Sequence, residues 1–137
     1  MPHRYRIQPE RELATFLFNG KLTVAEGAEL FLDYVRAADF NPQHVMLCDA
    51  RGVTEIEASF LSIFTKVARL APELSRFRHP VVSVVLVSNQ TVFGYVRMLE
   101  QILDMTTVIK MRPVWTEEEA LALAGRTELS FASLFAT

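Results

Sequence analysis

The sequence predicts an α/β domain in which a mainly parallel sheet of about five strands is combined with about four helices. Segments with strand and helix periodicity alternate along the chain, as is typical of parallel strands joined by right-handed crossovers. Residues 81–87, VVSVVLV, are apolar on both faces, as expected for a central strand covered by helices. Thr23 with Glu26, and Thr116 with Glu119, have the spacing of capping boxes, which predicts a helix start at each pair.

The first part of the chain predicts two strands followed by a helix. The expected strands are residues 5–7 and 13–18, and the first should pair antiparallel at one side of the sheet. The Asn-Gly pair at 19–20 is expected to form a turn. The helix should begin near Val24, pack one apolar face on the core, and end before the Asn-Pro pair at 41–42.

Strands and helices then alternate as far as Gly125, which is a natural stop for the last helix. Pro72 marks the end or a kink of the second helix, and the sequence SNQT at 88–91 offers caps for the third. The expected elements are a strand at 45–49, a connection at 50–57, a helix at 58–71, a strand at 81–87, a helix ending near 105, a strand at 108–111 and a helix after Thr116.

The chain is expected to form one domain over residues 1–127, followed by an apolar tail at 128–137. Phe131, Leu134 and Phe135 have helical spacing in this tail, and such residues are seldom left together in water. Two alternatives stay open: the tail covers the core of its own domain, or it contacts a second copy of the chain. A homodimer through the tail is the working expectation, because burying these side chains would stabilise the association of two copies. Most closed homo-oligomers are two-fold, so the tail should meet itself or a groove beside the third and fourth helices.

Composition excludes several functional classes. A formal net charge of −2 provides no basic field for nucleic acid, and no apolar run is long enough for a membrane span. The polar start of the chain predicts a cytoplasmic protein. Neither the single Cys48 nor the three scattered histidines predict a disulfide, a metal site or another cofactor. No catalytic motif is present, so an enzyme is not expected.

Residues 45–59, VMLCDARGVTEIEAS, resemble the strand-loop-helix signature of STAS domains, the anti-sigma-factor antagonist (SpoIIAA-like) family. Residues 88–98, SNQTVFGYVRM, are similar to the stretch after the central strand in uncharacterised bacterial SpoIIAA-like proteins. The resemblance implies the SpoIIAA-like fold and a regulatory protein-binding module. It covers approximately residues 4–125 in the order of elements.

The same resemblance implies that the usual phospho-switch of the family is missing. Ala58 stands where the family has its phosphorylated serine, and alanine cannot accept a phosphate. Glu57 stands at the position of the acidic residue, Ser59 matches the second hydroxyl, and Phe60 replaces the glycine that opens the helix. Ser59 is therefore the remaining candidate for phosphorylation.

In open parallel sheets, ligands collect at the carboxyl ends of the strands, and polar side chains of two connections should meet there. The expected binding residues are Asp49, Arg51 and Ser59 from one connection, Ser88, Asn89 and Thr91 from the next, and Arg97 from the following helix. A structural interpretation is also open: Ser59, Ser88 and Asn89 cap helices, and Asp49 accepts hydrogen bonds within its own connection.

Two functions remain as hypotheses. The first is a regulatory module that binds another protein through residues 49–59 and the polar row Ser59, Ser62, Lys66 and Arg69 of the second helix. The second is a carrier of a small apolar or amphipathic ligand, as the related lipid-binding CRAL-TRIO architecture suggests. Phe60, Phe64 and Phe77 are expected either to line such a pocket or to fill the core. An unexplained apolar cavity would favour the carrier, and a filled core would favour the module.

Overall fold

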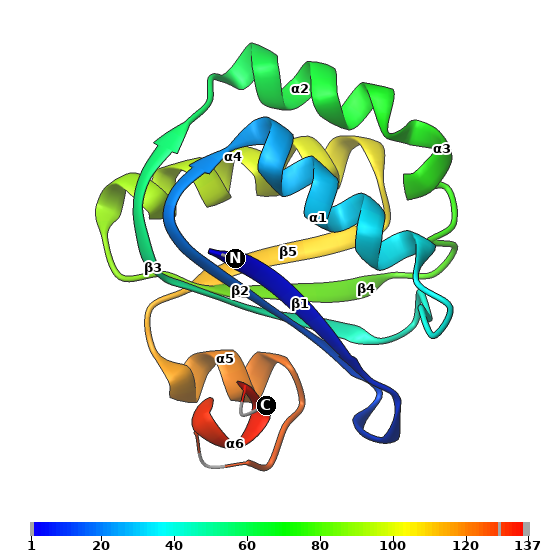
Figure 1. Ribbon diagram of the computed structural model, residues 1–137, viewed down its shortest axis with the longest axis vertical. Coiled ribbons are helices and arrows are strands. Elements are labelled where there is room, and N and C mark those ends of the chain that lie inside the picture. Colours follow the sequence, from blue (N-terminus) through cyan, green and yellow to red (C-terminus); the bar gives the residue numbers. More distant parts are fainter. Residues whose placement is uncertain (1, 129, 136–137) are drawn as a thin grey trace.

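A computed structural model describes residues 2–128 and 130–135. Its five strands form one sheet in the order β1-β2-β3-β4-β5, in which β1 pairs antiparallel with β2 and all other neighbours are parallel (Figure 1). The strands are β1 (His3–Gln8), β2 (Leu13–Thr23), β3 (Val45–Glu57), β4 (Val81–Leu86) and β5 (Ile109–Val114). The expected α/β class with a mainly parallel five-stranded sheet is confirmed.

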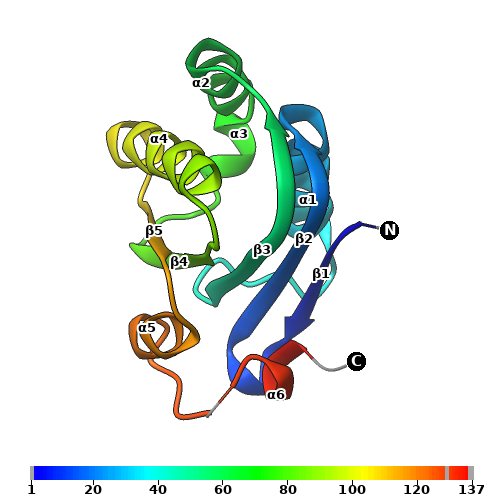
Figure 2. The same ribbon diagram turned by 90° about the vertical axis from the view of Figure 1, so that its left-hand side faces the viewer.

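The helices lie on both faces of this sheet. One face is covered by α1, α2, α3 and α4, and the other by α5 and α6 (Figure 2). Their bounds are α1 (Val24–Arg36), α2 (Phe60–Arg69), α3 (Ala71–Leu74), α4 (Gln90–Thr106), α5 (Glu117–Leu123) and α6 (Ala132–Phe135), and a 3-10 turn, η1 (Pro9–Arg11), joins the first two strands. The short α3 and α6 are additional to the four expected helices. Pro72 lies in α3 and starts a second helical segment after α2 ends.

Two strands are longer than the sequence predicts. The expected turn at 19–20 and the expected connection at 50–57 are both wrong, because these segments pair with each other as parallel strands, with Lys21 opposite Glu55 and Thr23 opposite Glu57. The register shifts between Leu17 and Asn19 and again between Gly20 and Lys21. Gly20 has a φ of 69°, so the Asn-Gly signal belongs to an irregularity within β2 and not to a hairpin.

Side-chain caps define the helix starts, as the sequence predicts. Thr23 Oγ1 accepts from the N–H of Glu26 at 3.1 Å, and the Glu26 carboxylate accepts from the N–H of Thr23 at 3.0 Å. The second expected box is only half formed. Thr116 Oγ1 accepts from the N–H of Glu119, but the Glu119 carboxylate binds the Thr116 hydroxyl at 3.2 Å and not its backbone. Gly125 follows α5 with a φ of 68°, as a helix stop requires.

The tail packs on the core of its own chain. Phe131 and Leu134 are buried in a cluster with Leu47 and Val84 of the central strands and with α5. Of the two alternatives for the tail, the structure therefore places these two side chains against their own domain, where a second copy cannot reach them. Residues 129 and 136–137 of this segment lie outside the described residues.

Candidate functional site

Arg51 is the centre of a polar cluster in the middle of β3, beside the carboxyl end of β4. Its guanidinium binds Asp49 through Nε–H at 3.0 Å and Nη2–H at 2.9 Å, and Glu117 of α5 through Nη1–H at 2.9 Å. The Ser88 hydroxyl donates to the Arg51 carbonyl at 2.9 Å. The structure thus brings together Asp49, Arg51 and Ser88, as expected, and adds Glu117, which sequence reasoning missed.

This cluster joins parts of the fold. The hydrogen bonds to Asp49, and to a smaller extent the hydrogen bond to Glu117, raise the pKa of Arg51 above its ordinary value, so the guanidinium stays charged. The guanidinium carbon of Arg51 lies 5.5 Å from the centre of the Phe131 ring. The Glu117 carboxylate also accepts a hydrogen bond from the N–H of Phe131, at 2.8 Å. Because two carboxylates already neutralise Arg51, the cluster offers a poor site for an added anion. It instead links β3, α5 and the tail.

The other expected residues do not converge on this cluster as one surface. Ser59 is separated from Asp49 because β3 continues to Glu57, and at about 3.3 Å per residue the strand from Asp49 to Glu57 is about 26 Å long. Ser59 and Ser62 form the capping box of α2, with hydrogen bonds of 3.1 and 2.8 Å. Asn89 caps α4 by accepting from Val92 at 2.9 Å. Ser59 and Asn89 therefore act as helix caps, as the structural interpretation predicted. Ser88 does not cap a helix, because its hydroxyl binds the Arg51 carbonyl.

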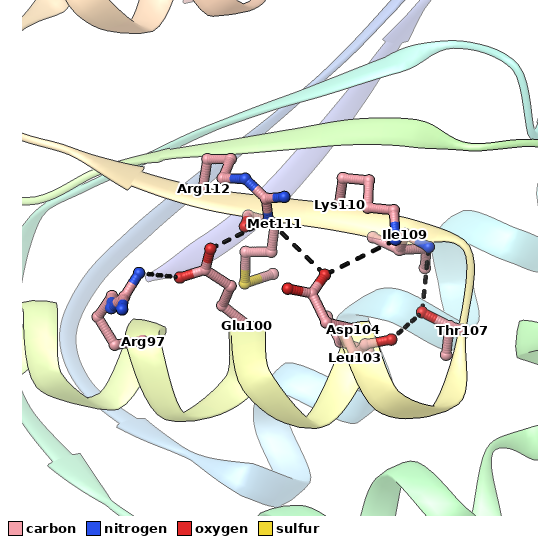
Figure 3. A network of polar contacts seen from close by, with 9 residues as sticks. All are labelled: Arg97, Glu100, Leu103, Asp104, Thr107, Ile109, Lys110, Met111 and Arg112. Carbon is pink, nitrogen blue, oxygen red and sulfur yellow. Dashed lines mark hydrogen bonds and ion pairs between the residues drawn. The ribbon is translucent and has the colours of Figure 1, made fainter.

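Thr91 and Arg97 lie on the exposed side of α4. Thr91 is in its first turn, and Arg97 binds Glu100 at 2.8 Å. Glu100 is only 5% exposed and also binds Arg112 of β5 at 3.0 Å, while Asp104 adds longer contacts to Arg112 and Lys110 (Figure 3). A buried carboxylate with two arginine partners is a satisfied charge. Arg97 thus belongs to a network that holds α4 against β5.

An apolar cavity lies between the sheet and the layer of α1, α2 and α4. Its volume is about 270 Å³, close to the lower end of the range of roughly 300–1,000 Å³ for ligand pockets. Its walls include Phe16, Phe18, Leu22, Leu30, Phe31, Met46, Ile56, Ile63, Val85, Val92, Leu99 and Met111. Several of these, such as Phe18, Leu22 and Ile56, are only partly buried, so the cavity is accessible from the surface.

Few polar groups reach this cavity. Cys48 and Ser83 are neighbours in its wall, and Lys66 of α2 is the cationic side chain among the lining residues. Burial raises the pKa of the Cys48 thiol to about 12, although a hydrogen bond with Ser83 acts in the opposite direction. The Cys48 thiol is therefore neutral near pH 7 and is not a reactive thiolate.

The exposed side of α2 carries Ser62 and Arg69 of the expected polar row, while Lys66 is half-buried, and it also carries large apolar side chains that the sequence pattern did not reveal. Phe60, Leu61 and Phe64 are 50%, 72% and 40% exposed, and the two phenylalanine rings stack at 6.0 Å. Neither ring lines the cavity, whereas Phe77 is buried in the core. The expectation that Phe60 lines a pocket or fills the core is wrong, whereas Phe64 lines a second pocket together with Phe77. Both rings of α2 flank the buried Ile63 and Val67 on the helix, and periodicity alone cannot tell how far the covered face extends.

No model of a protein family matches the chain, and no curated protein matches it. A search of solved structures finds an uncharacterized protein of the DUF3478 family with a SpoIIAA-like fold, from Shewanella loihica PV-4. The similarity has a TM-score of 0.52 at 15% sequence identity, and it covers 89% of this chain and 94% of that chain. The chain has a SpoIIAA-like fold, as the resemblance in residues 45–59 implied. At this identity the similarity establishes the fold and not the activity.

The described residues include neither a membrane-spanning helix nor a metal-binding cluster. Among residues 2–128 and 130–135, no helix has both the length and the apolar composition needed to cross a bilayer. In the same residues, no group of three or more His, Cys, Asp or Glu side chains is arranged to hold a metal ion.

Proposed function

We propose that this protein is a non-catalytic carrier or sensor that binds a small apolar or amphipathic ligand in the cavity between the sheet and α1, α2 and α4. The observation that supports the proposal is the free volume of about 270 Å³ at the place where a filled core would be expected. Protein interiors normally leave few voids larger than a water molecule, and an apolar void binds apolar molecules in preference to water.

The position of Lys66 favours an amphipathic ligand with an anionic head group. Lys66 lies in the wall of the cavity, is half-buried, and has no ion-pair partner among the described residues. An acyl chain would remove the apolar walls from water, while a carboxylate would meet the ammonium group of Lys66. A fatty acid combines these two features.

Gly27 provides a direct test. It lies in α1, lines the cavity, and a Cβ added there would have no heavy atom within 4 Å, so a larger side chain would occupy free space. A fluorescent fatty acid, cis-parinaric acid, should bind the intact protein saturably, and Gly27→Leu should weaken binding by about tenfold, or about 1.4 kcal/mol.

Gly94→Leu is the matched control. Gly94 is also a helical glycine with free space around its Cβ position, but it is exposed on α4 and outside the cavity. Gly94→Leu should bind the probe like the intact protein. The proposal is wrong if the probe does not saturate, or if the two variants bind it equally well. Lys66→Gln should weaken binding of the fatty acid more than binding of the corresponding fatty alcohol.

A second candidate is a regulatory protein-binding module without the usual phospho-switch, which the SpoIIAA-like fold favours. It has less support, because Arg51 already binds Asp49 and Glu117, and the hydroxyls of Ser59 and Ser62 are used as helix caps. Incubation with bacterial kinases should leave residues 57–60 unmodified. Stoichiometric phosphate on Ser59, detected by mass spectrometry, would instead favour a switchable module.

A further inference from the structure

The helix α2 presents an exposed apolar surface at one end of the molecule. Both ribbon views place it at the end opposite α5 and α6 (Figures 1 and 2). Leu61 is the most exposed of its large apolar side chains, at 72%, and the stacked rings of Phe60 and Phe64 lie beside it. Large apolar side chains that gather on one exposed helix face indicate an interaction site.

The charge of α2 is purely basic. Lys66 and Arg69 are its charged residues, and neither has an ion-pair or hydrogen-bond partner among the described residues. Every other described helix that carries charge includes an acidic residue. The nearest acidic side chains along the chain are Glu57, which binds Lys21 at 2.9 Å, and Glu73 of α3. The surface of α2 is therefore complementary to a negatively charged partner.

The same helix forms a wall of the cavity. Ile63, Lys66 and Val67 line the cavity, while Phe60, Leu61 and Phe64 face outward. A helix with exposed Phe and Leu on one side and only Lys and Arg as charges has the composition of a helix that lies in the interface of an anionic bilayer.

We infer that α2 docks this protein on an anionic lipid surface, with Phe60, Leu61 and Phe64 in contact with the acyl region and the exposed Arg69 at the head groups. The docking inference depends only on the outer face of α2. Uptake of a lipid-derived ligand from the membrane would, in addition, require the proposed function of the cavity. A second copy of the chain fits this face less well, because two-fold pairing of α2 with itself would bring like charges together.

Co-sedimentation of the full chain with lipid vesicles tests the inference. The protein should sediment with vesicles of equimolar phosphatidylcholine and phosphatidylserine, and much less with phosphatidylcholine alone. Raising the salt concentration should reduce binding, because salt screens the contribution of Arg69. Absence of sedimentation with the mixed vesicles, or equal binding to both kinds, would overturn the inference.

Leu61→Ser isolates the apolar contact, because this exposed side chain contributes little to the core. The variant should bind the mixed vesicles about fivefold more weakly. Leu123→Ser is the matched control: Leu123 is 49% exposed on α5, at the other end of the molecule, and its loss should leave vesicle binding unchanged. Arg69→Gln should weaken binding to the mixed vesicles only.

Two further outcomes separate this inference from its alternatives. If Leu61→Ser converts a dimer to a monomer in sedimentation velocity and leaves vesicle binding unchanged, α2 is a contact between copies and docking on lipid is wrong. Gly27→Leu should bind the fatty acid probe about tenfold more weakly and bind vesicles like the intact protein. If the intact protein binds the probe but not the vesicles, docking alone is wrong. If the intact protein binds the vesicles but not the probe, the cavity function alone is wrong.

Discussion

The Arg51 guanidinium holds the Asp49 carboxylate two residues away with two hydrogen bonds, of 3.0 and 2.9 Å, and so leaves its remaining Nη1–H group for Glu117. This bidentate pair is charge-assisted and joins the middle of β3 to α5 and the tail. Sequence reasoning expected an Asp49–Arg51 surface for a ligand. In the structure the same residues hold elements together.

Arg51→Gln should therefore lower the stability of the fold. The variant loses the contacts with Asp49, Glu117 and the Phe131 ring, and the free energy of unfolding should fall by about 1–2 kcal/mol, since the site is partly exposed but forms a network. Urea unfolding measures this change. Arg69→Gln is the control, because Arg69 has no partner in the described chain, and its effect should stay within about 0.5 kcal/mol. Equal effects of the two substitutions would show that the cluster does not contribute to stability.

Leu134→Ala should destabilise the monomer without changing its association state. Leu134 is fully buried in the second core cluster, and truncating such a side chain costs about 2–4 kcal/mol. Thermal unfolding and sedimentation velocity together check this expectation. Ala132→Ser, at an exposed position of the same helix, should change neither. A dimer in the intact protein that Leu134→Ala dissociates, with an unchanged melting temperature, would favour the dimer interpretation of the tail.

Tyr34→Phe should leave the fold unchanged or stabilise it by about 1 kcal/mol. The Tyr34 hydroxyl is buried and has no hydrogen-bond partner among the described residues, while its ring makes edge contacts with Phe16 and Phe40 that phenylalanine preserves. Burial also raises the pKa of this hydroxyl, so it remains neutral. Tyr5→Phe is the comparison, because it removes a hydrogen bond of 3.2 Å to the Asp33 carbonyl. A loss of stability in Tyr34→Phe larger than in Tyr5→Phe would contradict the assignment.

The capping box at Thr23 should make stability depend on pH in the acid range. The hydrogen bond from the Thr23 N–H is the main reason that the pKa of Glu26 lies below its ordinary value of 4.5. A carboxyl with a lowered folded-state pKa stabilises the protein above its unfolded pKa, and this contribution disappears as pH falls through the folded pKa. The melting temperature of the intact protein should therefore fall more steeply below pH 4.5 than that of Glu26→Gln.

The control for this prediction is Glu29→Gln, an exposed position on the same helix. Its acid dependence should match that of the intact protein. If Glu26→Gln and the intact protein lose stability in parallel as the pH falls, the ionised Glu26 does not contribute through the cap.

Local interactions explain which parts of this fold the sequence alone determined. Thr23, Ser59, Asn89 and Thr116 each start a helix because a side-chain oxygen accepts an N–H within the next three residues, and that contact needs no distant partner. The apolar run in β4 similarly predicts a central strand, because both faces of a covered strand must be apolar. The resemblance in residues 45–59 pointed to the right fold through the same local pattern.

Tertiary contacts decided the rest, and each case depends on distant residues. The sequence predicts a connection at residues 50–57. These residues instead form a strand, because residues 19–23 pair with them in the sheet. Phe64 and Phe131 are both apolar residues at helical spacing, yet Phe131 is buried against the sheet and Phe64 is exposed, since only Phe131 meets the second face of the sheet. The cavity follows from how α1, α2 and α4 are spaced above the sheet. Periodicity specifies which residues share a face, but the packing of other elements decides whether that face is covered and how much space remains beneath it.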